Sequence, residues 1–119
     1  MDRRQTGTLA ENRASAFLES QGFVIFTRNF LRRVGELDIV ARSGDPPGDL
    51  LIVAEVRTRG SDEYGGAAAS IGWSKQRRII ATTGLLLQRY PELRKLRVRF
   101  DVIIVRDGTI EWLRDAFRA

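Results

Sequence analysis

The sequence predicts an α/β protein in which helices cover a central mixed β-sheet, and three observations support this fold class. Segments with helical periodicity alternate with segments whose apolar residues follow strand patterns. Hydrophobic residues make up 43% of the 119 residues, which suits one core of ordinary size. The apolar runs are far shorter than the roughly 20 residues that a membrane span requires. We therefore expect a flexible basic arm at residues 1–6 and a single domain over residues 7–119.

The first half of the chain predicts one helix and three strands. A helix over Thr8–Gln21 follows from apolar residues at helical spacing, and Gly22 is typical of a position just beyond a helix end. Strand patterns follow at Phe23–Leu31, Glu36–Arg42 and Leu50–Arg59. Glycine and proline at residues 44–49 predict a turn, which favours a hairpin between the second and third strands.

The second half predicts a helix and further strands. Residues 60–66 are rich in glycine and polar residues and indicate a loop. The helix Ser74–Tyr90 is expected to have Ser74 as its N-cap and to end before Pro91. A strand at Arg97–Val105 leads through a turn into a short strand at Thr109–Glu111 and a helical tail.

The composition excludes several kinds of chemistry. The chain has no histidine and no cysteine, so Ser-His-Asp and Cys-His catalysis, zinc fingers and disulfides are excluded. Its 20 Lys and Arg residues exceed 15 Asp and Glu, which predicts a polyanionic partner such as nucleic acid. Only Lys75 and Lys95 are lysines, and this arginine excess is equally typical of a general compositional bias. Because no secretory signal is visible, we expect a cytoplasmic protein.

Acidic residues inside the predicted strands are the most informative feature. Glu36 and Asp38 are two positions apart and share a sheet face, and Glu55 shares its face with Arg57 and Arg59. A hairpin would bring Asp38 close to Glu55. Two carboxylates about 4 Å apart repel by about 4 kcal/mol at an effective dielectric of about 20. We therefore expect compensation, either by a divalent metal or by one of the two arginines.

Two further acids are less clear from spacing alone. Glu11 lies at the border of the apolar stripe of the first helix, where it either leans toward the sheet or is an ordinary solvated residue. Asp101 lies between apolar residues on the last long strand. For Asp101 we expect a buried salt bridge rather than a metal ligand.

Short motifs occur in a fixed order along the chain: Gly7-x-x-Ala10-Glu11, Arg28-Asn29, Gly35-Glu36-Leu37-Asp38-Ile39-Val40, Ala54-Glu55-Val56-Arg57-Thr58-Arg59, Gly65-Gly66, Lys75 with Arg78-Ile79, and Arg99-Phe100-Asp101. Together they resemble the YraN-type family of uncharacterised bacterial proteins over about residues 7–105. That family is placed in the PD-(D/E)XK superfamily of restriction endonucleases and Holliday-junction resolvases. The resemblance implies a three-layer α/β/α restriction-endonuclease-like fold around the mixed sheet.

The resemblance also implies a metal-dependent endonuclease that cleaves phosphodiester bonds. Asp38 and Glu55 match the two metal-binding acids, and Glu11 matches a helix carboxylate that completes such sites. Mg²⁺, or Mn²⁺, is the implied cofactor. Glu36 is expected to support the site by pairing with Arg59 or capping a loop, with a second metal as the alternative.

Arg57 is the departure from the superfamily pattern, which has lysine at this position. Arginine can contact a phosphate, but it cannot deprotonate water because its pKa stays above about 12. Lys75 matches the family's helix lysine and either replaces the missing ammonium or simply contacts phosphate or solvent. Two functions therefore stay open: an active nuclease, and a nucleic-acid-binding module that has lost catalysis.

The expected partner is nucleic acid, with DNA favoured. The candidate phosphate-contacting residues are all arginines: Arg28, Arg32, Arg33, Arg59, Arg77 and Arg78. Tyr64 and Trp73 are candidates for stacking on bases. No sequence-reading motif is present, which favours recognition of shape or backbone. A homodimer is compatible with this class, and a protein-interaction domain whose acids are all paired with arginines is the third hypothesis.

Overall fold

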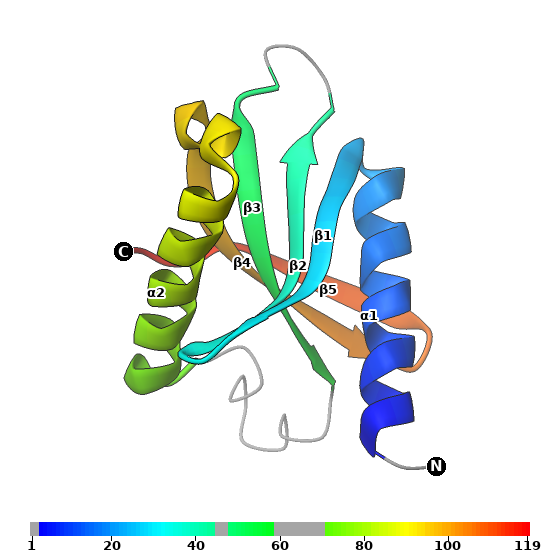
Figure 1. Cartoon of the computed structure of the whole chain (residues 1–119). Coiled ribbons are helices and arrows are strands. Elements are labelled where there is room, and N and C mark those ends of the chain that lie inside the picture. Colours follow the sequence, from blue (N-terminus) through cyan, green and yellow to red (C-terminus); the bar gives the residue numbers. More distant parts are fainter. Residues whose placement is uncertain (1–2, 45–47, 59–70) are drawn as a thin grey trace.

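A computed structural model describes residues 3–44, 48–58 and 71–119 of the chain. Its centre is a five-stranded sheet with the order β1-β2-β3-β4-β5, and helices α1 and α2 lie on opposite faces of that sheet (Figure 1). The predicted α/β fold with a central mixed sheet is therefore confirmed. None of the helices in the described ranges is long and apolar enough to cross a membrane.

The sheet is mixed because only one pair of neighbouring strands is parallel. The β1–β2, β2–β3 and β4–β5 pairs are antiparallel, whereas β3 and β4 are parallel. The chain passes from β3 to β4 through α2, as a parallel connection requires. The strands are β1 (Phe23–Arg32), β2 (Gly35–Ser43), β3 (Leu50–Thr58), β4 (Arg97–Arg106) and β5 (Thr109–Phe117).

Helix α1 (Arg3–Ser20) packs its small and apolar residues on one face of the sheet. Ala10, Ala14 and Leu18 are buried there against strand residues such as Ile39. The helix begins five residues before the predicted start at Thr8, so the backbone of residues 3–6, which the sequence assigned to an arm, is helical. Arginine and glutamine are good helix formers, and no proline stops the helix from extending in this direction.

Helix α2 (Trp73–Arg89) covers the opposite face and is followed by the short 3₁₀ helix η3 (Pro91–Lys95). The predicted stop at Pro91 is confirmed. The predicted N-cap is wrong, because Gly72 occupies that position and no side chain caps the helix. Ser74 instead lies inside the first turn, since the N-cap is two residues earlier than the pattern indicated.

The end of the chain differs from the prediction. Strand β5 continues to Phe117, and the predicted helical tail does not form. Trp112 packs edge-on against Phe17 and Phe23, with ring centroids 5.6 and 5.8 Å away. Its ring nitrogen also donates a hydrogen bond to Asp101. Burial of this aromatic residue in the sheet outweighs the local helical tendency of the tail.

The β1–β2 hairpin reaches across to helix α2 (Figure 1). A Cβ atom at Gly35 would lie 3.0 Å from the hydroxyl of Thr82 and 3.4 Å from the Cβ of Arg78, so only glycine allows this approach without adjustment. The contact sets the tip of the hairpin beside the N-terminal half of α2. Strand β3 also ends on this side of the molecule (Figure 1). Three elements that carry predicted site residues therefore converge here.

Candidate active site

Asp38 and Glu55 are neighbours at the point where the β2–β3 ladder ends. Ile39 of β2 pairs with Ala54 of β3. Asp38 directly precedes Ile39, and Glu55 directly follows Ala54. Beyond this pair, an Asp38 carboxylate oxygen accepts a hydrogen bond from the backbone N–H of Val56 at 2.9 Å. The two acid side chains also hydrogen-bond to each other. The predicted approach of Asp38 to Glu55 is therefore confirmed.

The environment of Asp38 favours its protonated form. Burial raises the pKa of Asp38 to about 8, and the negative charges of Glu55 and Glu11 act in the same direction. The hydrogen bond from the Val56 N–H opposes these effects, because it stabilises the ionised carboxylate. Near neutral pH the acid pair therefore retains a proton, which the hydrogen bond between the two side chains accommodates.

Lys75 provides the positive charge at this acid pair. Its Nζ atom lies 2.6 Å from Oε2 of Glu55, and the Glu55 side chain is 8% exposed while that of Lys75 is 43% exposed. The first turn of α2 places the ammonium above the end of β3. The sequence left a metal, Arg57 or Arg59 as compensation for the acids. Among the described residues, the ion pair to Glu55 comes from Lys75 instead.

Arg57 lies two residues after Glu55 and is partly buried at the end of β3. It makes no hydrogen bond or ion pair with any residue in the described ranges. Glu36, on β2, is exposed and likewise has no partner within those ranges. Its expected partner Arg59 and the candidate stacking residue Tyr64 lie outside the described residues.

Glu11 is held by the strand that carries the Arg28-Asn29 motif. The side-chain amide of Asn29 donates a hydrogen bond to Oε1 of Glu11 at 3.0 Å, and a guanidinium nitrogen of Arg28 lies 3.7 Å from the same atom. Asn29 has a φ of 53°, a left-handed conformation that asparagine tolerates better than most residues. Two of the motifs that define the resemblance are thus joined by direct contacts.

The position of Glu11 bears on the predicted metal ligands. Within residues 3–44, 48–58 and 71–119, no three acidic side chains gather closely enough to hold a metal ion. Glu11 acts on Asp38 through its charge, while its own carboxylate is engaged by β1. The structure therefore brings Asp38 and Glu55 together as a pair, and the metal-binding role of Glu11 stays a prediction.

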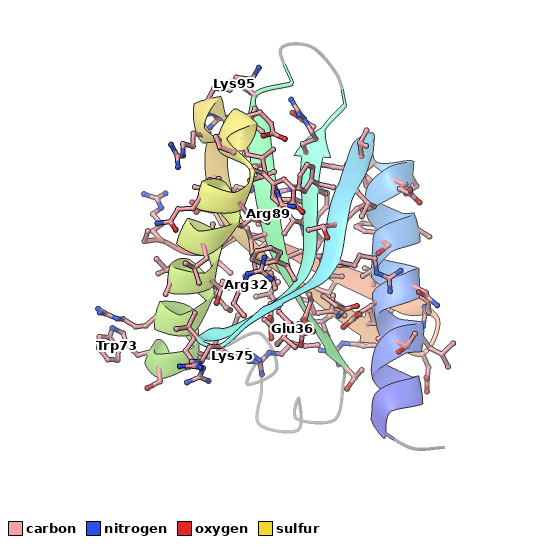
Figure 2. All side chains as sticks on the ribbon, viewed as in Figure 1. Arg32, Glu36, Trp73, Lys75, Arg89 and Lys95 are labelled. Carbon is pink, nitrogen blue, oxygen red and sulfur yellow. The ribbon has the colours of Figure 1, made fainter. Side chains whose placement is uncertain are left out.

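Four of the predicted phosphate-contacting arginines lie around the same end of the molecule. Arg32 and Arg33 are exposed at the tip of the hairpin, and Arg77 and Arg78 are exposed on α2. In the view of Figure 2, Arg32 and Lys75 lie near Glu36, whereas Trp73 is at the outer edge of α2. Arg28 is different, because it contacts Glu11 on the α1 side and its buried Nε atom has no hydrogen-bond partner.

Asp101 forms the buried salt bridge that its position predicts. The residue is fully buried, and its two carboxylate oxygens accept hydrogen bonds from Arg99 at 2.9 and 2.8 Å. The indole of Trp112 and the backbone N–H of Asp115 complete the set, each at 2.9 Å. The last two hydrogen bonds attach β5 to β4, and the four together give Asp101 a structural role.

Sequence reasoning missed one contributor to the site. Asn29 appeared only as part of a motif, without a role, although it positions Glu11. The available signal was an asparagine inside a strand pattern, because asparagine is poor in strands and tolerates a left-handed backbone.

The fold and the site define a class: a mixed-sheet α/β protein with a pair of acids where the pairing of two adjacent strands ends, one of them buried, and a helix lysine bound to it. Comparison with known families gives the particular group. The chain belongs to the uncharacterised protein family UPF0102, whose model matches residues 10–105. The resemblance to the YraN-type family is confirmed at this level.

Relatives in several bacteria match nearly the whole chain. A UPF0102 protein of Burkholderia vietnamiensis is 44% identical over 116 residues, which cover 98% of this chain and 78% of the relative. A UPF0102 protein of Cupriavidus metallidurans is 44% identical, with 93% and 79% covered. One from Xanthomonas euvesicatoria is 40% identical, with 98% and 94% covered.

Proposed function

We propose that this protein is a metal-dependent, endonuclease-like enzyme of the PD-(D/E)XK superfamily that acts on nucleic acid, with DNA favoured, in the cytoplasm. The observation that carries the proposal is the buried Asp38–Glu55 pair with Lys75 bound to it. Structural acids of this kind are normally neutralised by close salt bridges, as Asp101 is. Asp38 has no such cation among the described residues.

The donor set of the acid pair fits a hard divalent cation. Mg²⁺ and Mn²⁺ prefer carboxylate oxygens, and both side chains present such oxygens to the same place. A bound cation would also offset the burial and the repulsion that together keep a proton on Asp38. Asp38 and Glu55 would hold the ion, which would supply Lewis-acid activation of the phosphate and lower the pKa of a bound water.

The remaining residues suit the handling of a phosphate. The guanidinium of Arg57, which has no partner among the described residues, can form two parallel hydrogen bonds to a phosphate group. Lys75 can donate hydrogen bonds to a phosphate oxygen or to an attacking water while it stays bound to Glu55. The only other lysine, Lys95, lies at the far end of α2, in η3 (Figure 2). Lys75 therefore supplies the ammonium that position 57 lacks.

A second candidate function is a nucleic-acid-binding module without catalysis. The observation in its favour is Arg57 itself, because arginine cannot take part in proton transfer at neutral pH. In this case the exposed arginines would still bind phosphates, and Asp38 and Glu55 would only stabilise the fold. Binding would then survive both EDTA and the loss of Glu55.

The test of the main proposal is cleavage of a panel of duplex, branched and single-stranded DNA and RNA in Mg²⁺ and in EDTA. We expect cleavage that requires Mg²⁺ and is abolished by Glu55→Ala. The control is Glu19→Ala, which removes an exposed acid on α1 that lies outside the site. Intact substrates throughout the panel would contradict the enzymatic proposal.

The variant Arg57→Lys separates the two candidates. If the natural protein is inactive and Arg57→Lys cleaves, the arginine is the cause of the lost activity and the binding module is the correct reading. If the natural protein cleaves with Arg57 in place, the binding module is refuted. Salt dependence gives the second measurement, because log affinity for duplex DNA falls with log salt by about 0.9 for each phosphate neutralised.

A further inference from the structure

Trp73 is an exposed aromatic residue at the start of helix α2. It is 70% exposed, which is unusual for so large an apolar side chain. The guanidinium of Arg77, one turn along the helix, lies 4.9 Å from the centre of its ring. This contact supports the ring from one side and leaves most of it open to solvent. An aromatic ring fixed in this way is a platform for a planar ligand.

The tip of the β1–β2 hairpin presents two more exposed apolar side chains. Leu31 is 65% exposed and Val34 is 42% exposed. The close contact of Gly35 with Arg78 and Thr82 fixes the tip beside α2. The exposed apolar residues of the hairpin tip therefore lie near the N-terminal half of α2, which begins at Trp73.

The charges around these apolar residues are mainly positive, with the exposed Glu36 as an acid next to the hairpin tip. The charged side chains within residues 31–34 and 73–78 are all cationic: Arg32, Arg33, Lys75, Arg77 and Arg78. A surface that alternates exposed apolar groups with cations matches a polymer with anionic groups along its backbone and flat apolar faces beside them. Unpaired nucleotides have this chemistry, whereas in an intact duplex the bases are stacked on one another.

We propose that Trp73 stacks on an unpaired base, and that the substrates of this site are nucleic acids with unpaired nucleotides, such as single strands, frayed ends and junctions. This inference rests on the proposed function, because it names the substrate class of the same site. Trp73 points outward from α2, while Lys75, two residues later, reaches Glu55 (Figure 2). The first turn of α2 therefore carries both the proposed stacking residue and the lysine that reaches the acid site.

The experiment uses the fluorescence of the protein itself. The chain has two tryptophans, and Trp112 is packed between Phe17 and Phe23. Trp112 is partly buried, whereas Trp73 is 70% exposed, so added ligands reach Trp73 more readily. We expect a single-stranded oligonucleotide, titrated in EDTA so that no cleavage occurs, to quench the tryptophan fluorescence. An abasic oligonucleotide of the same length, which keeps the phosphates, should leave the fluorescence unchanged.

Substitution at Trp73 gives the second readout. Trp73→Leu should weaken binding of the single strand by about 5- to 150-fold, the range that corresponds to stacking on one base. Trp73→Phe, which keeps an aromatic ring, should restore most of the affinity. Binding of a blunt duplex should change less than twofold in both variants. Because the Trp73 side chain is exposed, both substitutions should leave the fold intact, and circular dichroism checks this.

The outcomes distinguish this inference from the proposed function. Quenching and selective loss of single-strand binding support stacking even if the protein cleaves nothing, because both are measured without metal. Absence of quenching, or equal weakening of single-strand and duplex binding by Trp73→Leu, overturns the stacking role even if cleavage is observed. Unchanged binding of all nucleic acids would also overturn it and would point to a protein partner at this surface.

Discussion

The Nζ atom of Lys75 lies 2.6 Å from Oε2 of Glu55, although the two residues are 20 positions apart and belong to different layers of the fold. The contact joins the start of α2 to the end of β3. It places an ammonium beside Asp38 and Glu55. The motif that carries Glu55 has Arg57 where the superfamily pattern has lysine. The first prediction therefore concerns this ion pair.

Replacing Lys75 should separate catalysis from folding. Lys75→Ala is expected to lower the cleavage rate by about 10²- to 10⁴-fold, the usual range for a group that assists proton transfer. The loss of stability should stay within about 1 kcal/mol, because the ammonium is 43% exposed and solvent screens the pair. Cleavage kinetics and urea unfolding measure the two effects.

Lys95→Ala is the matched control, since Lys95 is the only other lysine and lies in η3 away from the acids (Figure 2). It should cleave at the natural rate. Equal activity of Lys75→Ala and Lys95→Ala would show that Lys75 has no part in the reaction.

The raised pKa of Asp38 predicts how stability depends on pH. The value is about 8 in the folded chain against 3.8 ordinarily, so the folded state binds more protons than the unfolded state between these limits. The contribution of this group to stability is complete below pH 4 and is lost as pH rises toward 8, by up to about 1.4 kcal/mol per pH unit. Asp38→Asn removes the titration and keeps an acceptor for the Val56 N–H.

The variant should therefore gain stability relative to the natural protein as pH rises. Thermal unfolding of both proteins without metal, from pH 5 to pH 9, measures the difference. We expect the melting temperature of Asp38→Asn to exceed that of the natural chain by more at pH 8 than at pH 5. A difference independent of pH would mean that Asp38 ionises normally.

Asp101 should be essential to folding and not to chemistry. Asp101→Ala leaves Arg99, Trp112 and the N–H of Asp115 without their acceptor, and breaking a buried pair of this kind costs about 3–5 kcal/mol. Urea unfolding measures the loss. Glu19→Ala, at an exposed helix position, should stay within about 0.5 kcal/mol of the natural protein. A loss for Asp101→Ala below 1 kcal/mol, on the scale of an exposed pair, would contradict this role.

Two glycines should respond to alanine in opposite directions. A Cβ atom at Gly84, inside α2, would meet no atom within 4 Å, so Gly84→Ala should stabilise the protein by about 0.5–1 kcal/mol. A Cβ atom at Gly44 would lie 2.6 Å from the backbone oxygen of Gly22, so Gly44→Ala should be destabilising. Chemical unfolding of both variants tests the packing, and a destabilised Gly84→Ala would show that something approaches the helix there.

Much of the site was predictable because its acids depend on local rules. The alternation of side chains along a strand and the Gly- and Pro-rich turn together predict that Asp38 and Glu55 meet, and the β2–β3 register confirms it. The buried salt bridge of Asp101 followed from its position between apolar residues in a strand. These two predictions require only the two-residue repeat of side chains along a strand and the free-energy cost of burying an unpaired charge.

What could not be predicted depends on packing between distant segments. The orientation of α2 over the sheet decides that Lys75, and not Arg57, pairs with Glu55. The hydrogen bond from Asn29 to Glu11 depends in the same way on how α1 lies against β1. At the end of the chain, Trp112 packs against Phe17 and Phe23, which are far away in the sequence. Strand β5 therefore forms where the local pattern predicted a helix.

Asp38 and Glu55 are proposed to hold a divalent cation. The most direct measurement is anomalous diffraction from crystals soaked in Mn²⁺, with Glu55→Gln crystals as the control. We expect an anomalous peak in contact with carboxylate oxygens of both Asp38 and Glu55, which is absent in the variant. A natural protein in which Mn²⁺ binds only at surface acids, with Lys75 still closed on Glu55, would contradict this proposal.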